Sequence, residues 1–100
     1  MNASIYRISC LNESIKDSYV GVTKNVKQRQ RQHKYNVEKG KESNRWVYNK
    51  IRSEGGWSNW KFEILEEFPY DIKEMTDKER FYIKKFDPTL NHSKGGYPQK

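Results

Sequence analysis

SIYRISC at residues 4–10 and DSYVGVT at residues 17–23 are the two stretches that decide the fold. Both are rich in β-branched and aromatic residues, which favour strands. Between them, LNESIK at residues 11–16 contains the turn formers Asn and Ser. Together the three stretches predict a β-hairpin.

Side-chain alternation places two tyrosines on defined faces of this hairpin. Tyr6 shares its face with residues 8 and 10, and Tyr19 shares its face with residues 21 and 23. If even positions of the first strand pair with odd positions of the second, both tyrosines lie on one face, whereas a shift of one residue separates them. Gly21 lies mid-strand, where glycine weakens a sheet, so it indicates a place where another group approaches the backbone.

Two helices are predicted after the hairpin. Asn25 and Gln28 resemble a capping pair, and the residues from there to about position 37 are good helix formers. A second helix is expected over about residues 44–52, before the glycine pair at 55–56. Its core-facing side chains are expected to be Val47, Tyr48 and Ile51.

A third strand and a third helix follow. Residues 60–68 (WKFEILEEF) begin with apolar and charged side chains in alternation, as in a strand. Asp71 and Glu74 form another capping-like pair and open a helix that runs to about residue 86. The apolar stripe of this helix is Ile72, Met75, Tyr82, Ile83 and Phe86, with Glu79 in its one gap. This order predicts an α+β fold, a small three-stranded, mostly antiparallel sheet flanked by helices.

Composition fits one small domain over residues 1–100 and restricts its chemistry. The chain is 33% hydrophobic and 14% aromatic, enough for one modest core. Cys10 is the single cysteine and there are two histidines, which excludes a disulfide framework and a zinc cage of Cys and His. Without an apolar run of about 18 residues or a signal-peptide pattern, we expect a soluble, intracellular protein with no membrane contact.

Positive charge is concentrated in one part of the chain. The net charge is +7, and residues 24–52 hold ten Lys or Arg against only Glu38 and Glu42. Such a segment attracts polyanions, of which nucleic acid is the commonest. A solvated basic surface would have the same composition, so charge alone leaves both interpretations open.

Three sets of residues could carry chemistry, and each has a structural alternative. Glu79 on an apolar stripe needs a cation or strong donors, which either a metal ion or a structural ion pair would supply. Arg29 and His33 are four residues apart and therefore side by side on their helix, although such pairs often only face water. Strand tyrosines such as Tyr6 and Tyr19 are often packing residues.

The ordered pattern of these residues resembles the GIY-YIG nuclease family. Residues 4–6 (SIY) stand where the first motif belongs, and residues 19–21 (YVG) stand where the second belongs. Ser4 replaces the first glycine of the family triplet. Arg29, His33, Glu79 in ERFYIKKF and Asn91 in DPTLN match the family's remaining residues, so the resemblance covers about residues 3–96.

The resemblance implies a divalent-metal-dependent endonuclease that hydrolyses DNA phosphodiester bonds by a one-metal mechanism. One Mg²⁺ or Mn²⁺ ion is expected on Glu79. Arg29 would clamp the phosphate, and Tyr6 would deprotonate the attacking water with His33 as the acceptor. Tyr19 would orient the water or the phosphate, and Asn91 would brace the site.

The expected partner is DNA, and the expected contacts are basic. They are Lys24, Lys27, Arg31, Lys34 and Arg45. Trp57 and Trp60 could stack on bases, although packing is the favoured interpretation. The main alternative function is a non-catalytic basic nucleic-acid-binding module with the same fold.

Overall fold

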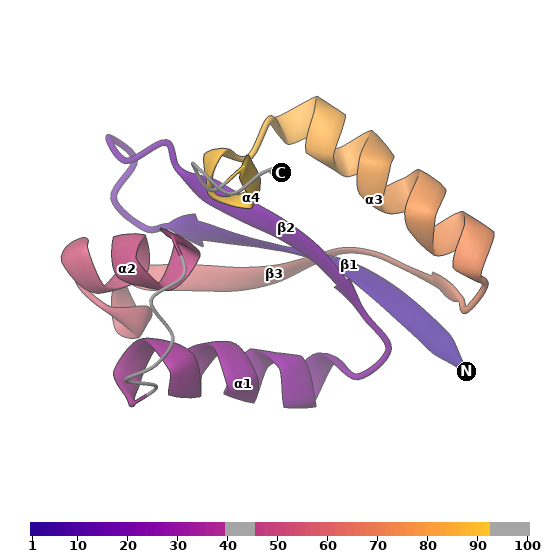
Figure 1. The fold of residues 1–100 in the computed structure, drawn as a ribbon, viewed down its shortest axis with the longest axis horizontal. Helices are drawn as coiled ribbons and strands as arrows, with labels where there is room; N and C mark the ends of the chain where they lie inside the picture. Colours follow the sequence, from indigo (N-terminus) through magenta and orange to yellow (C-terminus); the bar gives the residue numbers. More distant parts are fainter. Residues whose placement is uncertain (40–45, 93–100) are drawn as a thin grey trace.

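The computed structural model of the chain describes residues 1–39 and 46–92, which form a three-stranded sheet with helices on both faces (Figure 1). The elements follow the order β1 (Asn2–Cys10), β2 (Ser18–Thr23), α1 (Val26–Glu38), α2 (Trp46–Ser53), the short 3-10 turn η1 (Trp57–Asn59), β3 (Trp60–Pro69), α3 (Ile72–Phe86) and α4 (Thr89–His92). The predicted α+β fold class is confirmed.

The sheet has the order β2-β1-β3, and both strand pairs are antiparallel. In the β1–β2 hairpin, Tyr6 pairs with Gly21 and Ile8 pairs with Tyr19. Even positions of β1 therefore pair with odd positions of β2, and the predicted register that places both tyrosines on one face is confirmed.

Two hydrophobic clusters lie on opposite faces of the sheet. Helices α1 and α2 cover the face that carries Tyr6, and α3 covers the other face (Figure 1). The buried residues of the first cluster are Tyr6, Ile8, Cys10, Val37, Val47, Tyr48, Ile51, Trp60 and Leu90. The second cluster is built on Ala3, Ile5, Val20 and Phe68, with partly buried side chains of α3 packed against them. The core-facing residues predicted for the second helix are thus confirmed.

A register shift opposite Ile5 and Tyr6 lets even-numbered residues of β3 serve both clusters, with Trp60 and Phe62 in the first cluster and Phe68 in the second. Ile5 pairs with Glu66 of β3 and Tyr6 pairs with Ile64, so Leu65 is the extra residue of a bulge. Beyond the bulge, the face of β3 that meets Tyr6 carries Phe62, whose aromatic ring can then reach the tyrosine ring.

Both predicted capping pairs are formed. The Asn25 side chain accepts a hydrogen bond of 3.1 Å from the backbone N–H of Gln28 at the start of α1. The Asp71 side chain accepts one of 3.0 Å from the backbone N–H of Glu74 at the start of α3. These caps satisfy N–H groups that have no partner within the helix.

The structure corrects the apolar stripe of α3 at one end. Ile72 is 68% exposed, whereas Met75, Tyr82, Ile83 and Phe86 pack against the second cluster. Ile72 is the first residue of the helix, and at that position its side chain lies outside the cluster that the later turns complete. The first two residues of the predicted second helix, at positions 44 and 45, lie outside the described residues.

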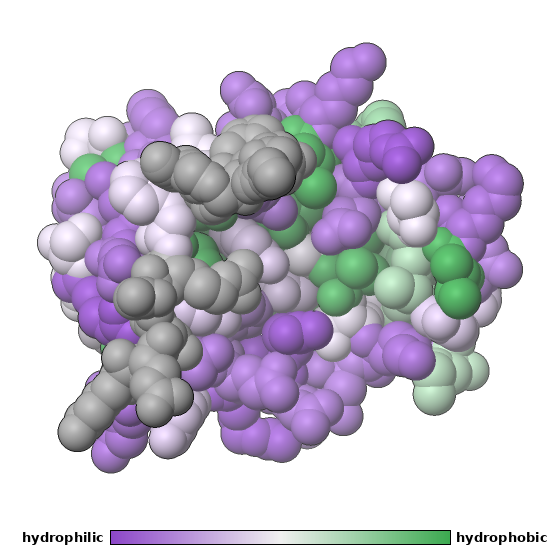
Figure 2. Space-filling model, viewed as in Figure 1, coloured by the Kyte–Doolittle hydropathy of each residue, from purple (hydrophilic) through white to green (hydrophobic). Residues whose placement is uncertain are grey.

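Polar side chains dominate the molecular face shown in Figure 2, and the hydrophobic residues visible there form small groups. Within residues 1–39 and 46–92, none of the helices combines the length and the apolar character that crossing a membrane would require.

Replacing Asn25 by Ala is expected to destabilise the fold, because α1 loses the side chain that caps its first turn. We expect the free energy of unfolding to fall by about 1 kcal/mol. Urea denaturation followed by circular dichroism measures this change. Asn25→Asp is the matched control and should stay close to wild type, since Asp caps equally well. Equal stability of the Ala variant and the wild type would contradict the capping role.

Candidate active site

A contact between Tyr6 of β1 and His33 of α1 lies at the centre of the site. The Tyr6 hydroxyl is 2.8 Å from Nε2 of His33, and each residue is 1% exposed. The Tyr6 ring also stacks on Phe62 of β3, with ring centroids 4.6 Å apart and planes 15° apart. Tyr6 is therefore held both by a hydrogen bond with the helix and by stacking within the sheet.

Tyr19 completes the aromatic group on this face. Its ring centroid lies 6.3 Å from that of Tyr6 and 5.7 Å from that of His33. Tyr19 is only partly buried, so it is the more accessible of the two tyrosines. The structure thus brings together Tyr6, Tyr19 and His33.

Gly21 is required by the position of Tyr6. A Cβ atom at Gly21 would lie 2.5 Å from the Tyr6 hydroxyl oxygen and 2.6 Å from Cζ of the same ring. The group that approaches the backbone at this glycine is therefore the ring of Tyr6, on the neighbouring strand.

Two oppositely charged residues act on the Tyr6 hydroxyl. Burial raises the pKa of Tyr6 far above its ordinary value, and the neighbouring Tyr19 adds to the rise. The positive charge of Arg29 lowers the same pKa, and the negative charge of Glu79 raises it. Arg29 and Glu79, from α1 and α3, therefore both lie within electrostatic range of Tyr6.

Glu79 is a partly buried carboxyl group without a compensating partner. Burial raises its pKa, and no hydrogen bond or charge from residues 1–39 or 46–92 offsets that effect. The structural ion pair considered for Glu79 is therefore not formed within these ranges. An unpaired carboxylate in such a position favours a bound cation.

Glu79 is suited to hold one hard divalent ion. Mg²⁺ prefers oxygen ligands and is often bound through one or two carboxylates, with water at the remaining positions. Within the described part of the chain, no group of three or more His, Cys, Asp or Glu residues could hold a metal. Among the described residues, an ion at this position would therefore have the Glu79 carboxylate as its candidate ligand, without a larger cluster of His, Cys, Asp or Glu around it.

Asn91 of α4 binds the open edge of the sheet. Its Oδ1 atom accepts a hydrogen bond of 2.7 Å from the backbone N–H of Val20, and its Nδ2 atom donates one of 2.8 Å to the Val20 carbonyl. Val20 stands between Tyr19 and Gly21, so Asn91 holds β2 at the residue between the two that lie next to Tyr6.

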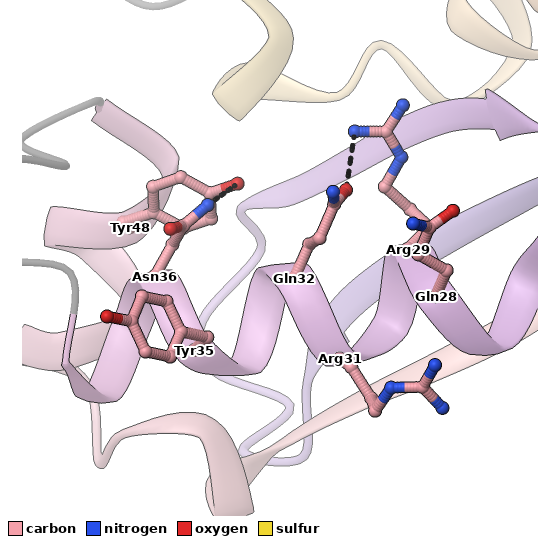
Figure 3. A pocket seen from close by; sticks show the side chains of 7 residues that line it. All are labelled: Gln28, Arg29, Arg31, Gln32, Tyr35, Asn36 and Tyr48. Atoms are coloured by element: carbon pink, nitrogen blue, oxygen red, sulfur yellow. Dashed lines mark hydrogen bonds between the residues drawn. The ribbon is translucent and has the colours of Figure 1, made fainter.

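A surface groove of about 640 Å³ runs along α1 (Figure 3). Its lining residues are Gln28, Arg29, Arg31, Gln32, Tyr35, Asn36 and Tyr48. Arg29 donates a hydrogen bond of 3.4 Å to Oε1 of Gln32, and the two side chains extend together while Arg31 extends in the opposite direction (Figure 3). The groove thus presents amide and guanidinium groups, and Tyr48, which also lines it, lies 2.9 Å from Nδ1 of the buried His33.

The basic residues expected to contact DNA are divided between two places. Lys24 precedes α1, and its ammonium lies 4.5 Å from the ring centroid of Tyr70. Lys27, Arg31 and Lys34 are exposed and share one face of α1, because they are four and three residues apart. Helical periodicity puts this face roughly opposite Arg29 and His33, and only Arg31 borders the groove. Arg45 lies outside the described residues.

Trp57 and Trp60 are both packing residues, which confirms the interpretation favoured from the sequence over base stacking. Trp60 is 6% exposed in the first cluster, and Trp57 packs against that cluster. Three site neighbours were missed from the sequence, namely Asn36, Tyr48 and Phe62. Asn36 follows His33 by three residues and could have been found from helical spacing. Nothing in the sequence links Tyr48 or Phe62 to Tyr6.

The chain is similar to known endonucleases over nearly its whole length. Residues 2–92 match the GIY-YIG catalytic domain model. Over 92 residues the chain is 30% identical to Intron-associated endonuclease 1 of Enterobacteria phage T4, a match that covers 91% of this chain and 36% of that protein. The chain therefore spans about a third of the length of this relative.

Solved structures show the same likeness in three dimensions. A mutant form of the catalytic domain of the intron endonuclease I-TevI superposes with a TM-score of 0.70 at 29% identity, covering 87% of this chain and 86% of that one. A second structure, of the catalytic domain of the homing endonuclease I-TevI, gives a TM-score of 0.71 at 28% identity, covering 85% and 88%.

Gly21→Ala is expected to displace the Tyr6 ring, because the added methyl would overlap the ring atoms. We expect a loss of about 1 to 3 kcal/mol in unfolding free energy, the usual cost of overpacking. The measurement is a double-mutant cycle with Tyr6→Ala, by urea denaturation. In the Tyr6→Ala background the glycine substitution should cost much less, and equal costs in both backgrounds would show that the ring is not the obstacle.

Glu79→Gln is expected to stabilise the protein at neutral pH. Because burial raises the pKa of Glu79, the folded state binds its proton more tightly than the unfolded state does. Stability from this group is therefore complete below the unfolded pKa of about 4.3 and is lost as pH rises through the higher folded value. The stability gained by replacing Glu79 with Gln should therefore increase as the pH rises from below this unfolded pKa to neutral pH.

Urea denaturation of both proteins in metal-free buffer, at acidic and at neutral pH, measures that gain. Glu74→Gln on the exposed side of α3 is the control, and it should show no gain at neutral pH. A Glu79→Gln effect that is the same at every pH would contradict an unfavourably buried carboxylate.

Proposed function

The chain belongs to the GIY-YIG family of catalytic domains, and from this premise we propose that it hydrolyses DNA phosphodiester bonds with one divalent cation. The observation that carries the proposal is the buried Tyr6–His33 contact of 2.8 Å, with the charges of Arg29 and Glu79 acting on the same hydroxyl. A proton-transfer group, a cation and a carboxylate at one place are the groups that phosphodiester hydrolysis needs.

Arg29 is the residue proposed to bind the scissile phosphate. A phosphodiester is anionic, so its attack builds negative charge that the site must neutralise. The guanidinium carries donors in a fixed fork that matches two phosphate oxygens. Arg29 lines the groove, and its guanidinium donates a long hydrogen bond of 3.4 Å to Gln32, so it can turn toward a substrate at little cost.

Tyr6 is proposed to deprotonate the attacking water. A buried phenol resists ionisation, and its pKa here is raised by burial. It therefore needs help from its neighbours at neutral pH. Arg29 lowers that pKa, and His33 shares a hydrogen bond with the phenol oxygen. Tyr19, the more accessible tyrosine, is proposed to orient the water or the phosphate.

Glu79 is proposed to hold one Mg²⁺ or Mn²⁺ ion. A bound ion would neutralise charge that develops on the phosphate. Support comes from the carboxylate itself, which is partly buried and has no partner in residues 1–39 and 46–92. Asn91 is proposed to keep β2, and with it Tyr19, in position through its two hydrogen bonds to Val20.

The groove along α1 is proposed as the path of the DNA backbone next to the scissile bond. Its Arg and Gln side chains suit phosphate contacts, which give affinity without sequence preference. Lys24 and Arg31 would extend the positive potential on either side. Because these contacts release counterions, binding should weaken as salt rises.

Nicking of supercoiled plasmid with and without Mg²⁺ tests the function. We expect wild-type cleavage only with the ion, and a loss of at least about 100-fold for Arg29→Ala and for Glu79→Gln, as for other transition-state contacts. Glu74→Gln and Arg80→Ala, both on exposed positions of α3, are matched controls and should cleave as wild type does.

DNA binding alone cannot decide between the proposed nuclease and a non-catalytic basic module, since both bind in a salt-sensitive way. Wild-type protein that binds plasmid but leaves it intact at every Mg²⁺ and Mn²⁺ concentration would favour the module.

A further inference from the structure

Helix α1 is attached to the rest of the protein along one side and is otherwise exposed. His33 and Val37 are its only buried residues, and the helix lies along the outer edge of the molecule (Figure 1). Tyr35, whose aromatic ring could fill a core, is instead 59% exposed. Packing within the domain therefore explains only one side of this helix.

The exposed part of α1 carries positive charge on two opposite faces. Arg29 lies on one of them, one turn before the buried His33, and lines the groove. Lys27, Arg31 and Lys34 are exposed and form the other, which we call the second basic face. Figure 3 shows the side chains of Arg29 and Arg31 extending in opposite directions from the helix. A partner of α1 must therefore supply negative charge on both sides of it.

The cations of the second basic face are not neutralised by the part of the chain that the structure describes. None of them has an ion pair there, and the one acidic residue of α1 is Glu38 at its end. On α3, by contrast, Lys73 pairs with Asp77 and Lys78 pairs with Glu74. Like charges three and four residues apart on a helix repel each other. An anionic partner would relieve this repulsion.

The separation of the two basic faces fits the two strands of a DNA duplex. An α-helix with its side chains is about 10–12 Å across. The major groove of B-form DNA is about 12 Å wide and admits one helix, with a phosphate backbone on each side. A single strand that follows the Arg29 face would have to wrap around α1 to reach the second basic face. The arrangement therefore favours a duplex over a single strand.

We propose that α1 enters the major groove of duplex DNA, with Arg29 on the phosphates of the cleaved strand and the second basic face on those of the complementary strand. The proposal rests on the proposed function, because it names the substrate of the same site as double-stranded. Tyr35 lines the groove of the protein between the two basic faces, so it would meet the base edges.

Neutralising the second basic face should weaken duplex binding and lower its salt dependence. The α1 variant is Lys27→Gln/Arg31→Gln/Lys34→Gln, and the probe is a fluorescein-labelled DNA duplex in metal-free buffer, followed by fluorescence anisotropy. Each lost phosphate contact reduces the slope of log K against log salt by about 0.9. We therefore expect the slope to fall by about 2 to 3 and binding at low salt to weaken at least about tenfold.

The matched control removes two lysines and one arginine from exposed positions of α3. This variant, Lys73→Gln/Arg80→Gln/Lys84→Gln, should stay close to the wild-type slope. An equal loss in the control would show that only net charge matters and would overturn the proposal, as would a wild-type slope for the α1 variant.

Single substitutions keep the test independent of how the triple variant folds. Lys27→Gln, Arg31→Gln and Lys34→Gln should each lower the slope for duplex DNA by about 0.9. Three single variants that all keep the wild-type slope would contradict phosphate contacts by this face.

Other nucleic acids test insertion into the groove. Single-stranded DNA offers no second backbone, and the major groove of an RNA duplex is too deep and narrow for side chains to read. With either probe, the triple substitution in α1 should change the slope by less than about 0.9. A loss as large as that on duplex DNA would overturn groove insertion and assign the second basic face to non-specific attraction.

Plasmid nicking separates binding from chemistry. The α1 variant keeps Arg29, His33 and Glu79, so its KM for plasmid should rise at least about tenfold while kcat stays near the wild-type value. A lower kcat with an unchanged KM would contradict a docking role.

The two proposals fail in different ways. If the wild type binds duplex DNA with the expected slopes but leaves it intact, the proposed function fails and the docking of α1 stands. If the wild type cleaves DNA and the α1 variant binds the duplex as tightly as the wild type does, only the docking proposal fails.

Discussion

The hydrogen bond between Tyr6 and His33 joins the sheet to α1 and sets the rest of the site. Because both residues are buried, each polar atom must find a partner inside the protein. That requirement fixes the distance of α1 from the sheet and leaves room only for hydrogen at Gly21. Because Arg29 is one turn before His33 on α1, the same contact also places Arg29 within electrostatic range of Tyr6.

One charged group near this contact opposes folding stability. Glu79 is partly buried, and within residues 1–39 and 46–92 no partner offsets the burial that raises its pKa. A fold selected only for stability would pair or replace this carboxylate. A cation bound there would account for such a group in a domain with a small core.

Local rules accounted for most of the fold. The capping residues Asn25 and Asp71 start α1 and α3 where the sequence predicted, and the alternation in β1 and β2 gave the right faces. The prediction that Ile72 belongs to the packed stripe of α3 was wrong, because periodicity treats every turn of a helix as equally covered. The second cluster begins only at later turns of α3. The bulge opposite Ile5 and Tyr6 could not be foreseen, since it depends on pairing with a strand some sixty residues away.

The sequence by itself determined which residues could do chemistry: tyrosines on one hairpin face, Arg29 and His33 one turn apart, and a carboxylate on an apolar stripe. These relative positions follow from the spacing of residues within one strand or helix, and the covalent chain enforces that spacing. Only the tertiary structure decided what each of them meets. Phe62 against Tyr6, Tyr48 behind His33 and Asn91 on the edge of β2 join different elements. Such contacts depend on how the helices pack on the sheet. No local sequence pattern encodes the distance between two elements or the direction in which one faces the other.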